Sequence, residues 1–299
     1  MKQTVIGYIY SSKIGRNGES FLKIAKMKDI DVILFDISAE IDERNLAEMD
    51  VCDVIYNDSG EDYAIFFTKI FESMGKIVVE SSKAFYDENK WNTFVKCKKF
   101  NIPTPRTILL SNDIEIAKQQ LIEFCEWPVI IKRVIGTWGE FVRKAENLDQ
   151  AVLVIQELFD KGGKKFPLIA QQFVESSSYR VTFIGKEIVQ TAIKENNSWK
   201  CTGVYARNFK RFDVDDDLKE IVNKIMDNFN INICGIDLHL NDGKWYVIEV
   251  NTEPALDFFE DEREILINKI IDLLVKISQT NKKAYPNVLT IENLDKTQS

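Results

Sequence analysis

The sequence is poor in the residues that usually build disulfide frameworks and transition-metal sites. Its five cysteines are odd in number and scattered, without a C-x-x-C pair or the spacing of a zinc site. Reduced thiols are expected, which is typical of a cytoplasmic protein. The chain has a single histidine, His239, and a lone histidine is more often a hydrogen-bonded structural residue than a metal ligand.

Long apolar runs and an excess of positive charge are also missing. No segment approaches the roughly 18 consecutive apolar residues of a membrane span, and the opening MKQTVIGYIYSSK lacks the apolar core and cleavage site of a secretory signal. The 39 Lys and Arg against 47 Asp and Glu give a net charge of −8, which argues against a general binder of phosphate backbones. These absences predict a cytoplasmic protein that binds neither a membrane nor a nucleic acid.

The hydrophobic residues that are present follow two successive patterns. With 299 residues, 45% of them hydrophobic, the chain is long enough for two or three subdomains. Between residues 4 and 81, short apolar runs alternate with helical-period segments, which predicts a parallel sheet with helices on its faces. Later runs predict antiparallel strands with helices behind them. The predicted fold class is therefore α/β followed by α+β.

Proline and loop signals divide the chain further. A helix predicted from about 88 to 100 stops before Pro103 and Pro105, which force extended backbone. The helix from Asp261 to about Lys276 is expected to cover the antiparallel sheet through its apolar stripe. The predicted divisions are an N-terminal α/β domain over 1–105, a small flap over 106–167, a C-terminal subdomain over 168–282 and a tail over 283–299.

An acidic hairpin is the feature that points to chemistry. The segment GIDLHLNDGKWYVIEVNTEPAL (residues 235–256) reads as two apolar strands about a turn, yet it contains Asp237, Glu249 and Asn251. The even separation of the two acids places them on one face if they are cross-strand partners, which predicts a three-residue loop over 242–244 with its glycine at positive φ. A two-residue turn would send the two acids to opposite faces.

Oxygen ligands in an apolar sheet need a positive partner, because an uncompensated buried carboxylate is costly. Two carboxylates and an amide suit Mg²⁺, with Mn²⁺ as an alternative ion, since both prefer oxygen ligands. We therefore predict that Asp237, Glu249 and Asn251 hold a magnesium ion that carries a nucleotide. The alternative is a solvated sheet face, on which such residues are ordinary.

At this point the sequence resembles an ATP-grasp enzyme, most nearly the RimK/LysX-type carboxylate–amine ligases. GIDLHL…VIEVNTEP resembles the family's metal-binding Asp and Glu-x-Asn, and PVIIKRVIGTWGEFV resembles its strand lysine followed by a Gly-rich loop. LIAQQFVE resembles its adenine hinge, and ENKWNTFVKCKKFNIPTPRT resembles its N-terminal ATP lysine and the helix that follows. The resemblance covers roughly residues 76–259. It implies an ATP-grasp fold with an N-terminal Rossmann-like (pre-ATP-grasp) domain.

The resemblance also implies an ATP site spread along the chain. Lys132 lies inside an apolar strand, where a free ammonium is costly to desolvate, so that a phosphate partner is expected. Lys90 would be the second phosphate cation, although by itself it reads as a surface residue. The glycines of the GTWG loop allow close approach to phosphate oxygens. The implied ATP-binding residues are Lys90, Lys132, Gly136, Thr137, Trp138, Gly139, Gln172, Phe173, Val174 and Ser178.

The sequence departs from the family pattern where the acyl substrate would bind. In SWKCTGVYARN, Lys200 stands at the position of the family's arginine and Thr202 at that of its asparagine, and paired glycines are missing. Lysine keeps the charge but loses the bidentate fork. Arg180 matches a family arginine and is expected to hold a substrate carboxylate or the acyl phosphate. The predicted catalytic residues are Arg180, Lys200 and Arg207.

Two classes of function compete. The resemblance implies an ATP-dependent ligase that joins a carboxylate to an amine through an acyl phosphate and releases ADP and phosphate. Its expected partners are small-molecule or peptide substrates and a second copy of the chain in a homo-oligomer, and a related version is a macrocyclase of a ribosomal precursor peptide. The rival is a catalytically inactive ATP-binding module. The altered region at Lys200 favours the module, whereas the complete set of metal ligands favours the enzyme.

Overall fold

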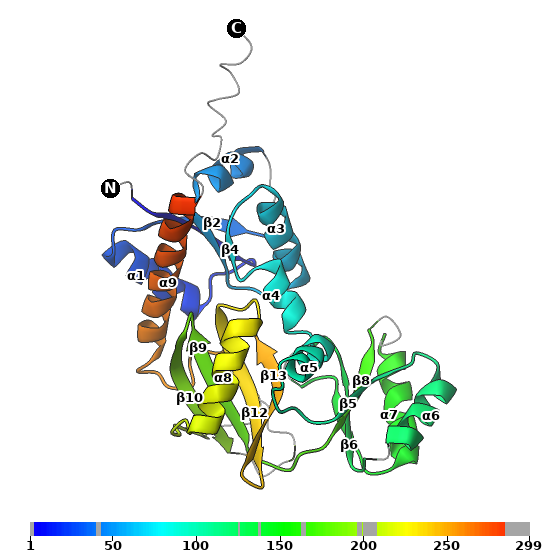
Figure 1. The fold of residues 1–299 in the computed structure, drawn as a ribbon. Coiled ribbons are helices and arrows are strands. Elements are labelled where there is room, and N and C mark those ends of the chain that lie inside the picture. The colour runs from blue at the N-terminus through cyan, green and yellow to red at the C-terminus, as the bar shows by residue number, and fades with distance from the viewer. Residues whose placement is uncertain are drawn as a thin grey trace. The chain divides into compact units, whose positions relative to one another are not determined.

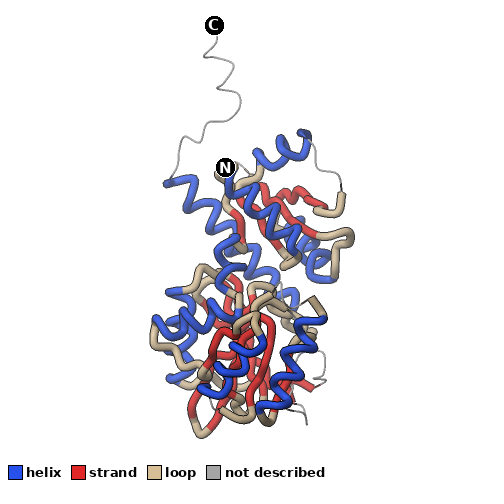
Figure 2. The backbone as a smooth tube through the Cα atoms, turned by 90° about the vertical axis from the view of Figure 1, so that its right-hand side faces the viewer, coloured by secondary structure: helices blue, strands red, loops and turns tan. Residues whose placement is uncertain are grey.

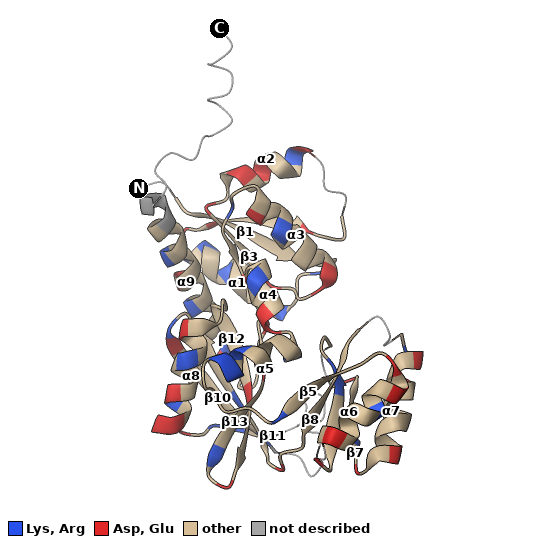
Figure 3. Cartoon of the chain, turned by 45° about the vertical axis from the view of Figure 1, so that its right-hand side comes forward, with Lys and Arg blue, Asp and Glu red and all other residues tan. Residues whose placement is uncertain are grey.

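The computed structural model describes residues 3–39, 43–124, 126–136, 139–162, 166–195, 199 and 208–284 (Figure 1). The chain forms two compact units, each assembled from segments that are separate in the sequence. The first unit contains Met1–Phe85, Ile231–Ile233 and Thr252–Ser299, and the second contains Tyr86–Asn230 and Cys234–Asn251. Charged residues of both signs are spread over the helices of the two units (Figure 3).

The first unit is built on a four-stranded parallel sheet in the order β2-β1-β3-β4. The alternation of strands and helices predicted between residues 4 and 81 is confirmed. The strands are β1 (Val5–Tyr10), β2 (Asp31–Asp36), β3 (Val54–Asn57) and β4 (Val78–Val79), and the helices are α1 (Arg16–Met27), α2 (Glu43–Val51), α3 (Asp62–Ser73) and α4 (Ser82–Asp87).

The core of the first unit explains one glycine of β1. Phe35, Ile55 and Phe71 are among the buried residues that pack beside the sheet. A Cβ atom on Gly7 would lie 2.8 Å from the ring of Phe35, so that only glycine allows this close packing. Gly7 thus lets these apolar side chains pack closely against β1, and their removal from water stabilises the unit.

The C-terminal helix does not pack where the sequence analysis placed it. Helix α9 (Arg263–Ala284) lies beside α1 and β3 of the first unit, whereas we predicted that it covers the antiparallel sheet (Figure 1). Two ion pairs of 2.7 Å reach α9, one from Lys23 of α1 to Glu264 and one from Lys28, the residue that follows α1, to Asp272. The prediction was wrong because an apolar stripe shows that one helix face is buried but not which sheet buries it.

The second unit contains two sheets with helices on the outside (Figure 2). The first has the order β5-β8-β6-β7, and its paired strands are antiparallel. Its strands are β5 (Thr107–Leu110), β6 (Val129–Arg133), β7 (Val142–Ala145) and β8 (Leu168–Gln172). Helices α6 (Ile114–Phe124) and α7 (Leu148–Asp160) contribute Leu121 and Ile155 to its core.

The other sheet has the order β11-β10-β9-β12-β13. Its strands are β9 (Ser178–Ile184), β10 (Glu187–Glu195), β11 (Asn208–Lys210), β12 (Ile233–Asn241) and β13 (Lys244–Asn251), and the helices nearest in sequence are α5 (Lys90–Lys99) and α8 (Asp216–Asn228). Asp215 caps α8 through the backbone N–H of Leu218 and accepts a hydrogen bond from Trp245 of β13. No helix among the described residues has the length and apolar character needed to cross a bilayer.

Candidate active site

The hairpin of β12 and β13 carries the three predicted metal ligands, but its turn is not the predicted one. Asn241 pairs with Lys244, so that Asp242 and Gly243 alone form the turn. Both turn residues have positive φ, 48° and 70°, as a two-residue hairpin turn of this kind requires. The predicted three-residue loop is therefore wrong, although the positive φ predicted for its glycine is confirmed.

A β-bulge places the two acids on one face despite the shorter turn. Asp237 lies opposite Glu249, but its neighbour Leu238 lies opposite Val247, so that Ile248 is an extra residue in β13. The extra residue shifts the alternation of side chains by one position, which compensates for the residue missing from the loop. The predicted pairing of Asp237 with Glu249 is confirmed for this reason.

Asp237 accepts hydrogen bonds from three neighbouring side chains. Arg180 of β9 donates from Nε to Oδ1 over 2.7 Å and from Nη2 to Oδ2 over 2.8 Å. The ammonium of Lys194, from β10, lies 3.4 Å from Oδ1, and Asn251 donates to Oδ2 over 3.2 Å. Burial alone would raise the pKa of Asp237, but the charges of Arg180 and Lys194 outweigh burial and hold this pKa well below its ordinary value. Asp237 is therefore ionised.

Lys90 joins the glycine-rich loop to the acidic hairpin. The side chain of Asn89 caps α5 by accepting from the N–H of Trp91, which fixes Lys90 at the first residue of the helix. Lys90 Nζ donates to the carbonyl of Gly136 over 2.9 Å and lies 3.4 Å from a carboxylate oxygen of Glu249. Gly136 has φ 143°, a conformation that side chains rarely adopt, so that this loop requires glycine there.

Lys132, on β6, is the most isolated charge of the group. Only 3% of the residue is exposed. Among the described residues, none accepts a hydrogen bond from its ammonium or lies within ion-pair distance of it. Burial lowers the pKa of Lys132 to about 8; the charge of Glu249 opposes this shift and that of Lys90 adds to it.

These side chains give the site an excess of positive charge. Lys132 interacts electrostatically with Lys90, Glu249 and Asp237, and Asp237 pairs with Arg180 and Lys194. Four cations thus surround two carboxylates. An excess of positive charge in a poorly solvated place is costly unless an anion binds there. The arrangement suits an anionic ligand that carries about two net negative charges, as the complex of ATP with one magnesium ion does.

The donor set of the hairpin fits a magnesium ion. Asn251 donates its amide N–H groups to Asp237 and to the carbonyl of Gly235, which turns its amide oxygen to the other side. The side chain of Glu249 is 24% exposed, and its one ion pair among the described residues, to Lys90, is a long 3.4 Å. Among the described residues, no group of three or more His, Cys, Asp or Glu side chains is arranged to hold a metal ion by itself. Two carboxylates and an amide, completed by phosphate and water oxygens, match the preference of Mg²⁺.

The predicted adenine hinge is partly engaged within the protein. The N–H of Phe173 donates to the carbonyl of Pro128 over 3.3 Å, and the carbonyl of Val174 lies 3.0 Å from Nδ1 of His239. Burial lowers the pKa of His239, which is consistent with the structural role expected for it. The ammonium of Lys144 stacks on the ring of Phe173, 4.4 Å from its centroid. Adenine recognition by this segment stays a prediction.

Four other predicted site residues lie outside the described residues, and the surroundings of three more do not test their predicted roles. Thr137, Trp138, Lys200 and Arg207 are outside the described residues. Ser178 is buried at the start of β9, opposite Lys194, and Gly139 has a positive φ of 65°. Gln172 lies at the end of β8, where its side-chain oxygen is 3.5 Å from the N–H of Arg106.

Sequence reasoning missed Lys194, which is 4% exposed and points at Asp237. The signal was available in the strand EIVQTAIKE, where a lysine follows an apolar run just as Lys132 does in PVIIKRV. Arg180 was predicted to hold a substrate group. Its guanidinium contacts Asp237 instead, and a role toward substrate stays a prediction.

Lys132→Met is expected to stabilise the fold while it weakens nucleotide binding. The fall of the pKa of Lys132 from 10.5 to about 8 corresponds to about 3 kcal/mol of unfavourable burial at pH 7. Between about pH 8 and 10.5 the Lys132 side chain keeps its proton in the unfolded chain but loses it in the folded protein. The free energy of unfolding of the wild type should therefore rise across this window. The advantage of Lys132→Met should therefore shrink as the pH rises. Urea unfolding at pH 7 and pH 10 measures it.

Lys144→Met is the matched control for this prediction, since Lys144 lies on the neighbouring strand β7 and is more exposed than Lys132. It should change the free energy of unfolding little at either pH. Equal effects of the two substitutions would contradict the burial assigned to Lys132.

Comparisons with known proteins identify relatives of this chain. Residues 87–275 match the family model described as a RimK-like ATP-grasp domain. The α-aminoadipate–LysW ligase LysX of Saccharolobus solfataricus is 32% identical over 176 residues, which are 56% of this chain and 62% of that protein. LysX of Sulfolobus acidocaldarius is 28% identical over 219 residues, covering 71% of this chain and 78% of the relative. The glutamate–LysW ligase ArgX of the same organism is 26% identical over 205 residues, covering 66% and 71%.

Solved structures share the fold at low sequence identity. A RimK domain ATP-grasp protein from Sphaerobacter thermophilus has a TM-score of 0.72 and 13% identity, covering 91% of this chain and 99% of its own. The ATP-grasp ligase PsnB, complexed with a minimal precursor, Mg and ADP, has a TM-score of 0.65 and 16% identity, covering 90% and 98%. The predicted ATP-grasp fold is confirmed by these likenesses.

Proposed function

The chain belongs to the RimK-like ATP-grasp family, and from this premise we propose that it joins a carboxylate to an amine through an acyl phosphate, with release of ADP and phosphate. The observation that carries the proposal is Lys132. A lysine that is 3% exposed and has no ion pair among the described residues is costly to keep charged, unless it serves an anion that binds beside it. The surrounding excess of positive charge supports a polyphosphate as that anion.

The chain's own residues supply positioning and electrostatic stabilisation. Lys90 and Lys132 would neutralise charge on the phosphate oxygens when the nucleotide binds, and Gly136 would let the backbone approach these oxygens. Asp237, Glu249 and Asn251 would hold magnesium, which supplies charge neutralisation at the phosphate oxygens when bound. We further propose that residues 106–167 act as the flap that excludes water, which would otherwise hydrolyse an acyl phosphate.

Arg180 and Lys194 have a separate role in this proposal. Both contact Asp237, so that they orient the carboxylate and keep it ionised at neutral pH. If a metal ion binds one carboxylate oxygen of Asp237, the N–H group of Arg180 that donates to this oxygen becomes available for another acceptor. The released donor is suited to the oxygens of an acyl phosphate, where charge develops during the reaction.

The substrates are proposed to be amino-acid, peptide or protein-borne groups. Two relatives are named as ligases of α-aminoadipate or glutamate with LysW, and PsnB is solved with a precursor. The altered residues Lys200 and Thr202 distinguish this chain from the family pattern and favour a substrate of its own. They also support the second candidate, an ATP-binding module without catalysis.

ADP formation separates the two candidates. We expect the full chain, with ATP and magnesium, to release ADP only when a carboxylate and an amine are both present, because the acyl phosphate needs an acceptor. The measurement is a coupled ADP assay over a panel of amino acids, dipeptides and short peptides, offered singly and in pairs. Tight ATP binding without ADP release for any pair would favour the module and contradict the ligase.

A further inference from the structure

The first unit contains a hollow of about 380 Å³ that the ATP site does not explain. Its lining comes from β1, the segment that follows β1 up to the first turn of α1, the segment after β3, and Asp257. In the sheet order β2-β1-β3-β4, β2 lies on one side of β1 and β3 lies on the other. The connection from β1 therefore leads to one side of the sheet, and the connection from β2 crosses to the other side. The gap between the carboxyl ends of β1 and β3 is therefore a topological switch point. Open parallel sheets bind small ligands at that place.

Tight packing fixes the acidic side of the hollow. Tyr8 and Tyr56 both donate their hydroxyls to Asp58, over 2.5 Å and 3.2 Å, one to each carboxylate oxygen. A Cβ atom on Gly18 would lie 2.9 Å from the hydroxyl of Tyr8, so that a glycine in the first turn of α1 lets this helix approach the pair. Asp58 is thereby held in one position beside the start of α1.

The hollow carries charges of both signs. Lys13 and Arg16 line it on the α1 side, and among the described residues neither pairs with a carboxylate. Asp58, Glu61 and Asp257 line it as well. Asp257 has a long ion pair of 3.9 Å with Arg263. Two separate cations and three carboxylates around one hollow are the complement of a small molecule with an ammonium and a carboxylate.

We propose that this hollow is a binding site for a free amino acid. The carboxylate of the ligand would meet Arg16 and Lys13, and its ammonium would meet Asp58 and Asp257. A nucleotide fits poorly, because three carboxylates repel its phosphates. A simple diamine would leave the two cations without a partner. Tyr10 and Tyr8 add hydroxyls and apolar ring surface, which suit an amino-acid side chain.

The inference goes beyond the proposed function and does not rest on it, because the hollow is lined by residues of the first unit and the ATP site by residues of the second. Binding itself requires neither ATP nor turnover. A failure of the ligase proposal would therefore appear in the ADP assay, and a failure of this inference would appear in binding experiments without nucleotide.

The test is calorimetric titration of the full chain with each of the twenty free L-amino acids, without ATP or magnesium. At least one is expected to bind. Its N-acetyl and its carboxyl-amide derivatives should each bind at least tenfold more weakly, because each removes one of the two charges. Acetate and putrescine, which carry charge of one sign, should show the same loss.

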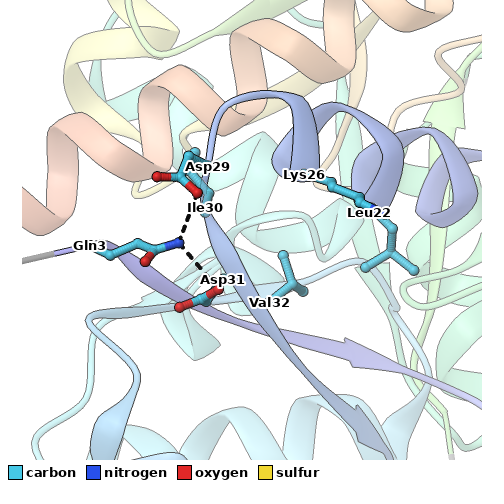
Figure 4. Close-up of a pocket in the computed structure, with 7 residues that line it drawn as sticks. All are labelled: Gln3, Leu22, Lys26, Asp29, Ile30, Asp31 and Val32. Carbon is cyan, nitrogen blue, oxygen red and sulfur yellow. Dashed lines mark hydrogen bonds between the residues drawn. The ribbon is translucent and has the colours of Figure 1, made fainter.

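Two exposed residues of the hollow and one control locate the site. Arg16→Ala and Asp257→Asn should each weaken binding of that amino acid at least tenfold and leave the far-UV spectrum unchanged. Lys26→Ala is the control, because Lys26 is a basic residue of the same helix that lines a different hollow beside Gln3 and Asp31 (Figure 4). The inference is overturned if no amino acid binds, if the blocked derivatives bind equally well, or if Lys26→Ala has the same effect as Arg16→Ala.

Discussion

Arg180→Met is expected to lower the free energy of unfolding by about 3 kcal/mol or more and to abolish ADP formation. The guanidinium of Arg180 makes the two shortest hydrogen bonds to Asp237, 2.7 Å and 2.8 Å, and its side chain is 9% exposed. Removing one partner of a buried ion pair leaves the other charge uncompensated, which typically costs about 3–5 kcal/mol. Lys194, at 3.4 Å, replaces only part of this interaction. Urea unfolding at pH 7 measures the loss.

Arg143→Met is the matched control for Arg180→Met. Arg143 also pairs with a carboxylate, Glu157, over 2.7 Å, but the two side chains are 28% and 38% exposed. Surface ion pairs of this kind contribute about 0–1 kcal/mol. If the two substitutions lower the free energy of unfolding equally, the charge of Asp237 is not buried and does not rely on Arg180 for compensation.

Glu249→Gln should lower the rate of ADP formation by at least about a hundredfold without unfolding the protein. The substitution is nearly isosteric, but it removes one of the two anionic metal ligands, and a lost electrostatic contribution of about 3 kcal/mol corresponds to that factor. Because the ion pair that Glu249 makes within the described part of the chain, to Lys90, is a long 3.4 Å, the free energy of unfolding should change little. The rate is measured with saturating ATP and the best substrate pair.

Glu220→Gln controls for the loss of a negative charge elsewhere in the second unit. Glu220 lies on α8 and pairs on the surface with Lys224. Its substitution should leave turnover unchanged. Undiminished turnover of Glu249→Gln would remove the metal assignment from the hairpin.

The hairpin shows how much of the site could be predicted from sequence. The even spacing of Asp237 and Glu249 led to the right pairing, because side chains alternate along a strand. The bulge at Ile248 was not predictable, since a three-residue loop and a two-residue turn with a bulge give the same facing residues. The sequence thus predicted which residues face one another, but not the combination of turn and bulge that brings them together.

The long-range packing was less predictable than the local elements. The apolar stripe of α9 predicted a buried face, yet the helix packs against α1 and β3. Lys194 was missed because its partner, Asp237, is 43 residues away in the chain and the contact depends on the neighbouring strands β9 and β12. The family resemblance, by contrast, was confirmed, because it rests on several motifs whose order and spacing agree.

Magnesium dependence of ATP binding is the measurement that tests the central claim most directly. Calorimetric titration of the full chain with ATP should give one site per chain in the presence of magnesium. Binding should weaken at least tenfold when the metal is chelated, and again in Lys132→Met, because the excess of positive charge around Asp237 and Glu249 is matched to the complex of ATP with the ion. Absence of ATP binding, or equal affinity with and without magnesium, would contradict the account.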